Sequence, residues 1–171
     1  MARNGVKITG KGLAGVSANL RLLSAVEVLA GFPAETTDRD ADEGGDEGIT
    51  NAYLAYLHDN GAPEANIPAR PFMAPALKSV EDKIKRQFKA IAKQALDGDA
   101  GSVERGFHTV GLTAQLAIQN TINSNIGPPL APRTLSARRK RGHEGTKTLV
   151  ETGAMRNAAS YAIRARKQRS K

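Results

Sequence analysis

The sequence predicts an α+β domain in which a small antiparallel β-sheet packs against two long helices, with extended loops between the elements. Between residues 75 and 123, apolar residues recur every three or four positions in two runs, which is typical of two amphipathic helices. Segments 25–31 and 158–165 instead alternate along the chain, as half-buried strands do. The length of 171 residues fits one domain, for which we expect the bounds 1–164.

The N-terminal part is predicted to hold a strand near 5–8, a short helix and a second strand near 25–31. The helix is indicated by apolar residues at spacings of three and four, namely Leu13, Val16, Leu20 and Leu23. Gly31 and Pro33 stop the second strand. Residues 49–60 are most simply a short helix, although so brief an apolar run is also compatible with a strand.

Residues 35–48 are strongly acidic, with seven carboxylates and Arg39 as the only base. Like charges at this density repel one another, so we expect an exposed, flexible loop. The Asp-x-Asp-x-Asp pattern at 38–42 is compatible with calcium binding. However, an EF-hand loop that begins at Asp38 needs Gly at its sixth position and Glu at its twelfth, where the chain has Glu43 and Ile49. No metal site is predicted here.

The two long helices are predicted near 75–96 and 102–123. Pro75 suits the first turn of a helix, and Ser102 can cap the second helix. Because only Asp97-Gly98-Asp99 and a few neighbours separate the two, an antiparallel hairpin is the simplest arrangement. The apolar surface of the second helix extends beyond one face, because Leu112, Leu116 and Ile118 lie outside the main apolar stripe. We therefore expect this helix to be covered by other parts of the protein on two sides, and a second subunit could provide one of these contacts.

The C-terminal part is predicted to be mostly irregular before a final strand. Prolines and basic residues make 126–148 a basic, Pro-rich loop, within an irregular stretch that covers 123–145. A turn or a single helical turn follows near 149–156, and the strand at 158–165 runs into a basic tail at 165–171.

Positive charge is concentrated at this end of the chain. The net charge is +8, but residues 1–132 hold 13 basic and 15 acidic side chains, whereas residues 133–171 hold 12 basic and 2 acidic ones. The basic runs at 138–141 and 164–171 could contact phosphates, or they could meet the acidic 35–48 segment of a neighbouring copy. No Phe, Tyr or Trp is interleaved in 138–141, so base stacking is not indicated.

Patterns typical of catalysis or of cofactor binding are missing. The chain has no Cys, and its three histidines lack metal-ligand spacing. Neither a Gly-x-Ser-x-Gly nucleophile elbow nor a Walker loop occurs. Residues 10–15 match Gly-x-Gly-x-x-Gly, but they lack a long preceding strand and a later acidic residue at the required distance. We therefore expect no enzyme, no cofactor and no metal.

The N-terminus lacks the apolar region of a secretory signal, and no apolar stretch approaches the length of a bilayer span. We expect a soluble protein, made in a cytoplasm-like compartment, without a membrane partner.

Four segments, in their order along the chain, resemble one known family. Asn51–Gly61 (NAYLAYLHDNG) is similar to a helical segment of that family, and Ile67–Met73 (IPARPFM) to its Pro-Ala-Arg-Pro-Phe signature. Pro128–Leu135 (PPLAPRTL) and Leu149–Arg156 (LVETGAMR) resemble two further motifs, with Glu151 in place of the usual Asp. The family is the virion-morphogenesis proteins of tailed bacteriophages, which complete the tail or join it to the head. The resemblance covers residues 49–164.

The resemblance implies a mixed α/β subunit that forms a ring, commonly a hexamer, between the tail tube and the head connector. The implied partners are further copies of the chain, the tail tube protein and the connector or stopper protein, and genomic DNA in the central channel stays open as another. The implied location is the head–tail junction of the virion, after assembly in the host cytoplasm. The residues alone leave one alternative open, a nucleic-acid-binding accessory protein that uses the basic C-terminal segment.

The motifs and the basic run give a set of candidate contact residues. In the Pro-stiffened segment, Arg70 and Phe72 could brace the long helix or dock on a neighbouring subunit, or Phe72 could belong to the subunit's own core. Thr152 and Gly153 are expected to form the turn that aligns the last strand, with Gly153 in a conformation closed to other residues. The candidate interface residues are Arg70, Phe72, Pro128, Pro129, Leu130, Arg133, Arg138, Arg139, Lys140, Arg141, Thr152, Gly153 and Arg156.

Overall fold

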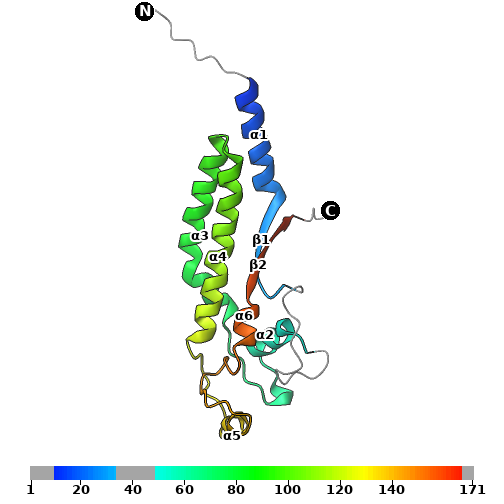
Figure 1. The fold of residues 1–171 in the computed structure, drawn as a ribbon, viewed down its shortest axis with the longest axis vertical. Helices are drawn as coiled ribbons and strands as arrows, with labels where there is room; N and C mark the ends of the chain where they lie inside the picture. The colour runs from blue at the N-terminus through cyan, green and yellow to red at the C-terminus, as the bar shows by residue number, and fades with distance from the viewer. Residues whose placement is uncertain (1–9, 34–48, 167–171) are drawn as a thin grey trace, which may run out of the picture.

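The computed structural model describes residues 10–33 and 49–166, with side chains from residue 14 onward. The predicted strand near 5–8, the acidic 35–48 segment and most of the basic tail lie outside the described residues. The described part is an elongated α+β fold, as the sequence predicts (Figure 1). Two long antiparallel helices run along it, and the short helices gather at one end.

The hairpin consists of α3 (Met73–Leu96) and α4 (Ala100–Asn123), which confirms the two predicted long helices. The cap of α4 is Asp99 instead of Ser102, because the Asp99 side chain accepts a hydrogen bond from the backbone N–H of Ser102 (2.9 Å). Close packing of the hairpin requires Gly106, since a Cβ at that position would lie 2.4 Å from Ile91 Cγ1.

The sheet has two strands in the described residues, β1 (Val26–Gly31) and β2 (Ser160–Ala165). They pair antiparallel with Val26 opposite Ala165 and Gly31 opposite Ser160. An exposed ion pair between Glu27 and Arg164 (2.8 Å) joins their side chains. The helix predicted around Leu13–Leu23 is α1 (Gly10–Ala25), which runs directly into β1.

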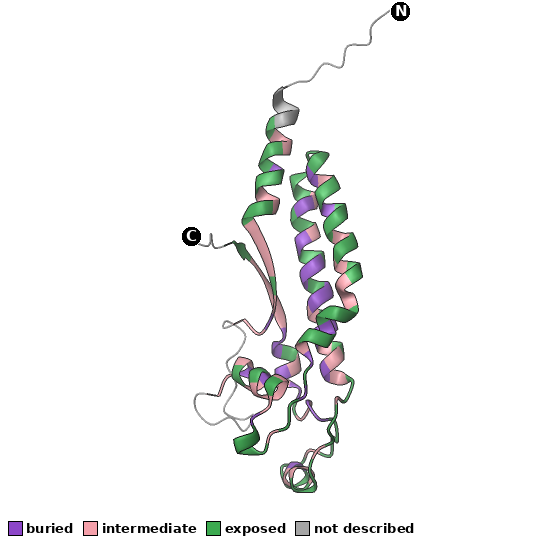
Figure 2. Ribbon diagram, turned by 180° about the vertical axis from the view of Figure 1, so that it is seen from behind, coloured by how far each residue is buried: buried purple, intermediate pink, exposed green. Residues whose placement is uncertain are grey.

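The sheet packs on α4, whereas α3 packs mainly on α4 and α1. Of the two long helices expected to cover the sheet, α4 makes most of the contact, while Ile84 of α3 packs in the same apolar cluster as Val28 and Ile163 of the strands. Figure 2 shows the buried residues concentrated on α4, which lies between α3 and the sheet. One end of the hairpin core contains Ile91, Val103, Phe107 and Val110, and the other contains Phe72, Ile118 and Ile122.

Four short helices complete the structure: α2 (Asn51–Asn60), η3 (Pro63–Ala65), α5 (Pro132–Lys140) and α6 (Ala154–Ala158). The helical prediction for 49–60 and the single helical turn near 149–156 are confirmed. The irregular stretch predicted for 123–145 is wrong over α5. Pro132 begins this helix at a position that tolerates proline, and residues 133–141 contain no Pro or Gly to interrupt it.

Gly111 provides the closest approach between α4 and the sheet. A Cβ at this position would lie 2.2 Å from Cδ2 of Tyr161 on β2, so any larger residue displaces the ring. We expect Gly111→Ala to lower the free energy of unfolding by about 1–3 kcal/mol, as measured by urea denaturation. In the control Gly101→Ala, the new Cβ comes closest to the flexible tip of Arg105 (3.2 Å from Nη1) and makes an ordinary contact with Asp99 Oδ1 (3.7 Å), so stability is unchanged or increased. Equal effects of the two substitutions would contradict this packing.

Candidate functional site

The four segments that carry the resemblance fold into one end of the molecule, which we call the basal lobe (residues 49–72 and 124–158). It contains α2, η3, α5 and α6, which lie together at the lower end in Figure 1. Three kinds of contact join the segments: a helix cap, a set of arginine–carbonyl hydrogen bonds and an ion-pair network.

Asp59 joins the first segment to the second by capping α3. Its Oδ1 atom accepts hydrogen bonds from the backbone N–H groups of Phe72 (2.7 Å) and Met73 (3.0 Å). Phe72, the residue at the cap position of α3, makes no side-chain cap of its own. The carboxylate of α2 thus satisfies the free N–H groups at the start of the long helix and compensates their positive dipole end.

Arg70 joins the second segment to the third. The residue is only 4% exposed, and its guanidinium donates from Nε to the carbonyl oxygen of Pro128 (3.0 Å) and from Nη2 to that of Pro129 (3.5 Å). Burial, and then the charge of Arg138, lower the pKa of Arg70 below its usual value. Arg70 therefore braces the fold from within, which is one of the two roles the sequence leaves open.

Arg138 joins α5 to the segment before α6. Although it lies in the basic run, it is 5% exposed, and its guanidinium donates to the carbonyl oxygens of Lys147 (2.7 Å), Val150 (3.1 Å) and Thr148 (3.4 Å). A fourth bond reaches the carbonyl oxygen of Gly145 (3.3 Å). The charged guanidinium of Arg138 thus donates to several carbonyl oxygens and makes more hydrogen bonds than any other polar side chain in the described residues.

Glu151 completes an ion-pair network at the same place. Its Oε2 lies 3.3 Å from Nε of Arg138, close enough for an ion pair although the angle is unsuitable for a hydrogen bond. Its Oε1 accepts hydrogen bonds from Nε (3.0 Å) and Nη2 (2.6 Å) of Arg141. One carboxylate thus serves two arginines, so a positive charge remains uncompensated in the lobe.

His58 lies on α2 beside these arginines. Burial is the main cause that lowers its pKa, and the positive charges of Arg70 and Arg138 lower it further. Its Nδ1 atom is buried and has no hydrogen-bond partner within the described residues. At neutral pH the ring is therefore uncharged.

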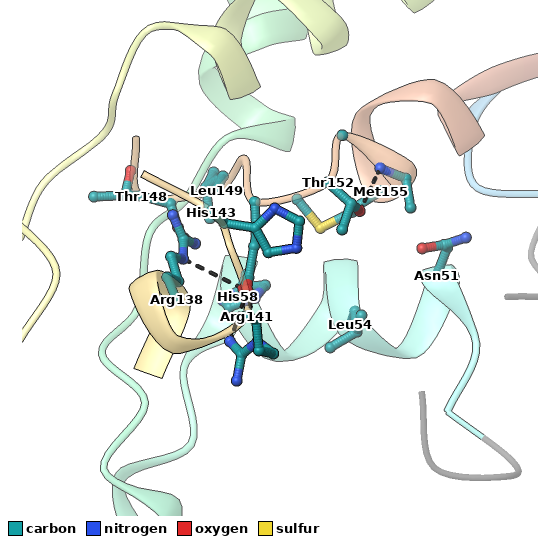
Figure 3. Close-up of a pocket in the computed structure, with 13 residues that line it drawn as sticks. Asn51, Leu54, His58, Arg138, Arg141, His143, Thr148, Leu149, Thr152 and Met155 are labelled. Carbon is teal, nitrogen blue, oxygen red and sulfur yellow. Dashed lines mark hydrogen bonds and ion pairs between the residues drawn. The ribbon is translucent and has the colours of Figure 1, made fainter. Parts of the chain in front are cut away.

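Two cavities flank this network. The first has a volume of 550 Å³ and lies between α2, the end of α5 and the start of α6. Figure 3 shows Arg138, Arg141, His58 and His143 grouped at one side of it, with Asn51 at the other. The second, of 710 Å³, is a groove between residues 60–70 and 129–134. The two share a wall, which contains His58, Arg138, Thr148 and Glu151.

The remaining candidate residues differ in how far their side chains are buried. Phe72 is fully buried and makes an edge contact with Phe32, so it belongs to the subunit's own core and does not dock on a neighbour. Gly153 has φ = 90°, as predicted, and the backbone N–H of Ala154 donates to Thr152 Oγ1 (3.2 Å) in the turn. Arg156 is half-buried beside Asn123 and Asn157. The exposed or half-exposed candidates are Pro128, Pro129, Leu130, Arg133, Arg139, Lys140 and Arg141.

Sequence reasoning missed the roles of Asp59, His58 and Glu151. Asp59 precedes the helix it caps by 14 residues, so no capping pattern marks it. Glu151 could have been noticed as one of only two carboxylates among residues 133–171.

No model of a known protein family matches the chain, and no curated protein or solved structure is significantly similar to it. Within residues 10–33 and 49–166, no three His, Cys, Asp or Glu side chains are grouped so that they could hold a metal ion. Across the same described ranges, each helix is too short or too polar to span a bilayer.

Arg138 and Arg139 are adjacent in the sequence but differ in burial, which gives a matched pair of variants. We expect Arg138→Gln to lower the free energy of unfolding by about 3 kcal/mol, because it removes a buried charge from its ion pair with Glu151 and leaves several carbonyl oxygens without their charged donor. Arg139 is exposed, so Arg139→Gln should change stability by no more than about 0.5 kcal/mol. Chemical denaturation measures both, and a similar small loss in each variant would contradict the structural role of Arg138.

The lowered pKa of His58 predicts a loss of stability in mild acid. A histidine with a pKa below 6.5 in the folded state binds fewer protons than in the unfolded state, so stability falls as the pH drops below 6.5. Thermal unfolding between pH 7.5 and pH 5 should therefore show a smaller decrease in Tm for His58→Gln than for the parent chain. If His58→Gln keeps the pH dependence of the parent chain, His58 is not the responsible group.

Proposed function

We propose that this chain is a structural subunit of a tailed-phage virion, a tail-completion or head–tail joining protein that forms a ring between the tail tube and the head connector. The observation that carries the proposal is the ordered set of four motif segments, whose residues contact one another in the basal lobe. Arg70 reaches from the second segment to the third, and Asp59 reaches from the first to the second. Four chance matches would have no reason to contact one another in this way. The contacts therefore support a shared origin of the four matches.

A ring subunit must bury surface against copies of itself, and α4 supplies an apolar face for this purpose. Leu112 and Leu116 lie one helical turn apart and are 48% and 54% exposed, whereas Ile118 is fully buried. The structure therefore leaves part of the apolar surface of α4 uncovered in the isolated chain. Contact with a second subunit along this face would remove it from water.

The alternative, a nucleic-acid-binding accessory protein, has less support from the basic run than the sequence suggests. Arg138 is buried and Arg141 pairs with Glu151, so only Arg139 and Lys140 of residues 138–141 are exposed without an ion pair in the described part of the chain. Two lysine or arginine contacts provide little phosphate affinity at physiological salt.

The ring is tested by removing the exposed apolar face of α4. The full chain is expected to form ring-shaped particles in negative-stain electron microscopy and a discrete oligomer in analytical ultracentrifugation. The double variant Leu112→Asp/Leu116→Asp should be monomeric and folded, because both leucines are about half exposed and neither belongs to the buried core.

The control is Leu96→Asp, which changes an equally exposed leucine at the far end of the hairpin and should leave the rings intact. A parent chain that stays monomeric at all concentrations and is retained by duplex DNA in a salt-sensitive way would contradict the ring and favour the alternative.

A further inference from the structure

The groove between residues 60–70 and α5 has the shape and the lining of a peptide-binding surface. Its volume is 710 Å³, and its apolar wall includes Ile67, Pro68 and Leu130. Prolines fix the backbone on both sides, at Pro68 and Pro129, so the wall is formed before any partner arrives.

The charge of the groove is positive. Arg70, Arg133 and Arg138 line it, against Glu151 as the only carboxylate among its described lining residues. The hydrogen bonds of Arg70 and most of those of Arg138 go to neutral carbonyl oxygens, which do not cancel the charge. Glu151 is shared with Arg141 as well. Burial is the main cause of the lowered pKa of His58 in the same wall, and the charges of Arg70 and Arg138 lower that pKa further.

The adjoining cavity contains polar atoms without partners. Asn51 is 4% exposed, and its Oδ1 has no hydrogen bond within the described residues, as is also true of Nδ1 of His58. Buried polar atoms in native proteins are nearly always hydrogen-bonded, so a polar group or water molecule that enters this cavity would find two atoms that still need a partner. A polypeptide offers both N–H donors and oxygen acceptors to meet them.

We propose that this groove binds the acidic segment 35–48 of a second copy of the chain. The segment carries seven carboxylates and one arginine, which complements the groove in charge. No Phe, Tyr or Trp lines the described walls of the groove, so nucleic-acid bases would find no stacking surface there. The inference deepens the proposed ring, because it names one head-to-tail contact between neighbouring subunits.

The test is complementation between two full-length variants, each of which lacks one half of the contact. The groove variant is Arg133→Glu, which alters an exposed side chain on α5. The segment variant combines Asp38→Asn, Asp40→Asn, Asp42→Asn and Asp46→Asn. In sedimentation experiments each variant alone should associate more weakly than the parent, by about fivefold for each charge pair lost.

An equimolar mixture should recover association, but only as dimers, because each pair of chains retains a single intact groove and segment. This recovered association should weaken between 0.05 M and 0.5 M salt. Arg139→Glu makes the same charge change on the same helix outside the groove and should associate like the parent. A synthetic peptide of residues 34–49 should bind the segment variant, whose own carboxylates no longer compete, and bind the groove variant less tightly.

Three results would overturn the proposal. Parent-like association of both single variants would show that the groove and the segment do not meet. Loss of association in each variant without recovery in the mixture would place the contact within one chain. Salt-sensitive binding of duplex DNA that Arg133→Glu abolishes, with no binding of the peptide, would assign the groove to nucleic acid. Rings that persist in both variants would contradict this contact but not the proposed ring. Dimers in the mixture without any ring in the parent would support this contact and contradict the proposed ring.

Discussion

The burial of Arg138 is the constraint on which the basal lobe depends. A guanidinium that is removed from water needs hydrogen-bond acceptors or a counter-charge. Here four carbonyl oxygens of residues 145–150 accept from its two terminal nitrogens, and the carboxylate of Glu151 forms an ion pair with Nε. These bonds fix the path of a segment without regular structure, which in turn places α6 and the start of β2. Arg70 does the same for the Pro-Pro segment before α5. The lobe is therefore organised around two buried charges more than around an apolar core.

The molecule therefore divides into two parts that are stabilised by different kinds of contact. The hairpin and the sheet are held by apolar contacts along α4, where Gly106 and Gly111 allow Ile91 and Tyr161 to approach the helix backbone. The basal lobe has few large buried apolar side chains of its own and depends on polar contacts. Its grooves remain open because charged side chains, unlike a hydrophobic core, do not collapse to close packing. A positively charged, partly polar surface is a natural contact for an acidic segment.

The two long helices, α1, α2 and both described strands could be predicted from the sequence, because periodicity reports directly which face of an element is buried. The predictions failed where contacts between residues far apart in the sequence determine the structure. A run of four basic residues favours a solvated loop, yet in α5 Arg138 turns inward while Arg139 and Lys140 stay exposed. The capping of α3 by Asp59 depends on the path of residues 60–71, which no local pattern specifies. The same limit applies to the site, since the motifs indicated which segments matter but not that their arginines are internal.

If the Arg138 contacts hold the basal lobe together as one cooperative unit, hydrogen–deuterium exchange of Arg138→Gln should reveal it. Proteins open in cooperative units, so loss of one central contact should release the whole unit. We expect faster amide exchange throughout α2, residues 67–72 and residues 142–153, with the half of the hairpin near residues 91–110 unchanged. Faster exchange confined to residues 142–151, with α2 and residues 67–72 still protected, would contradict it.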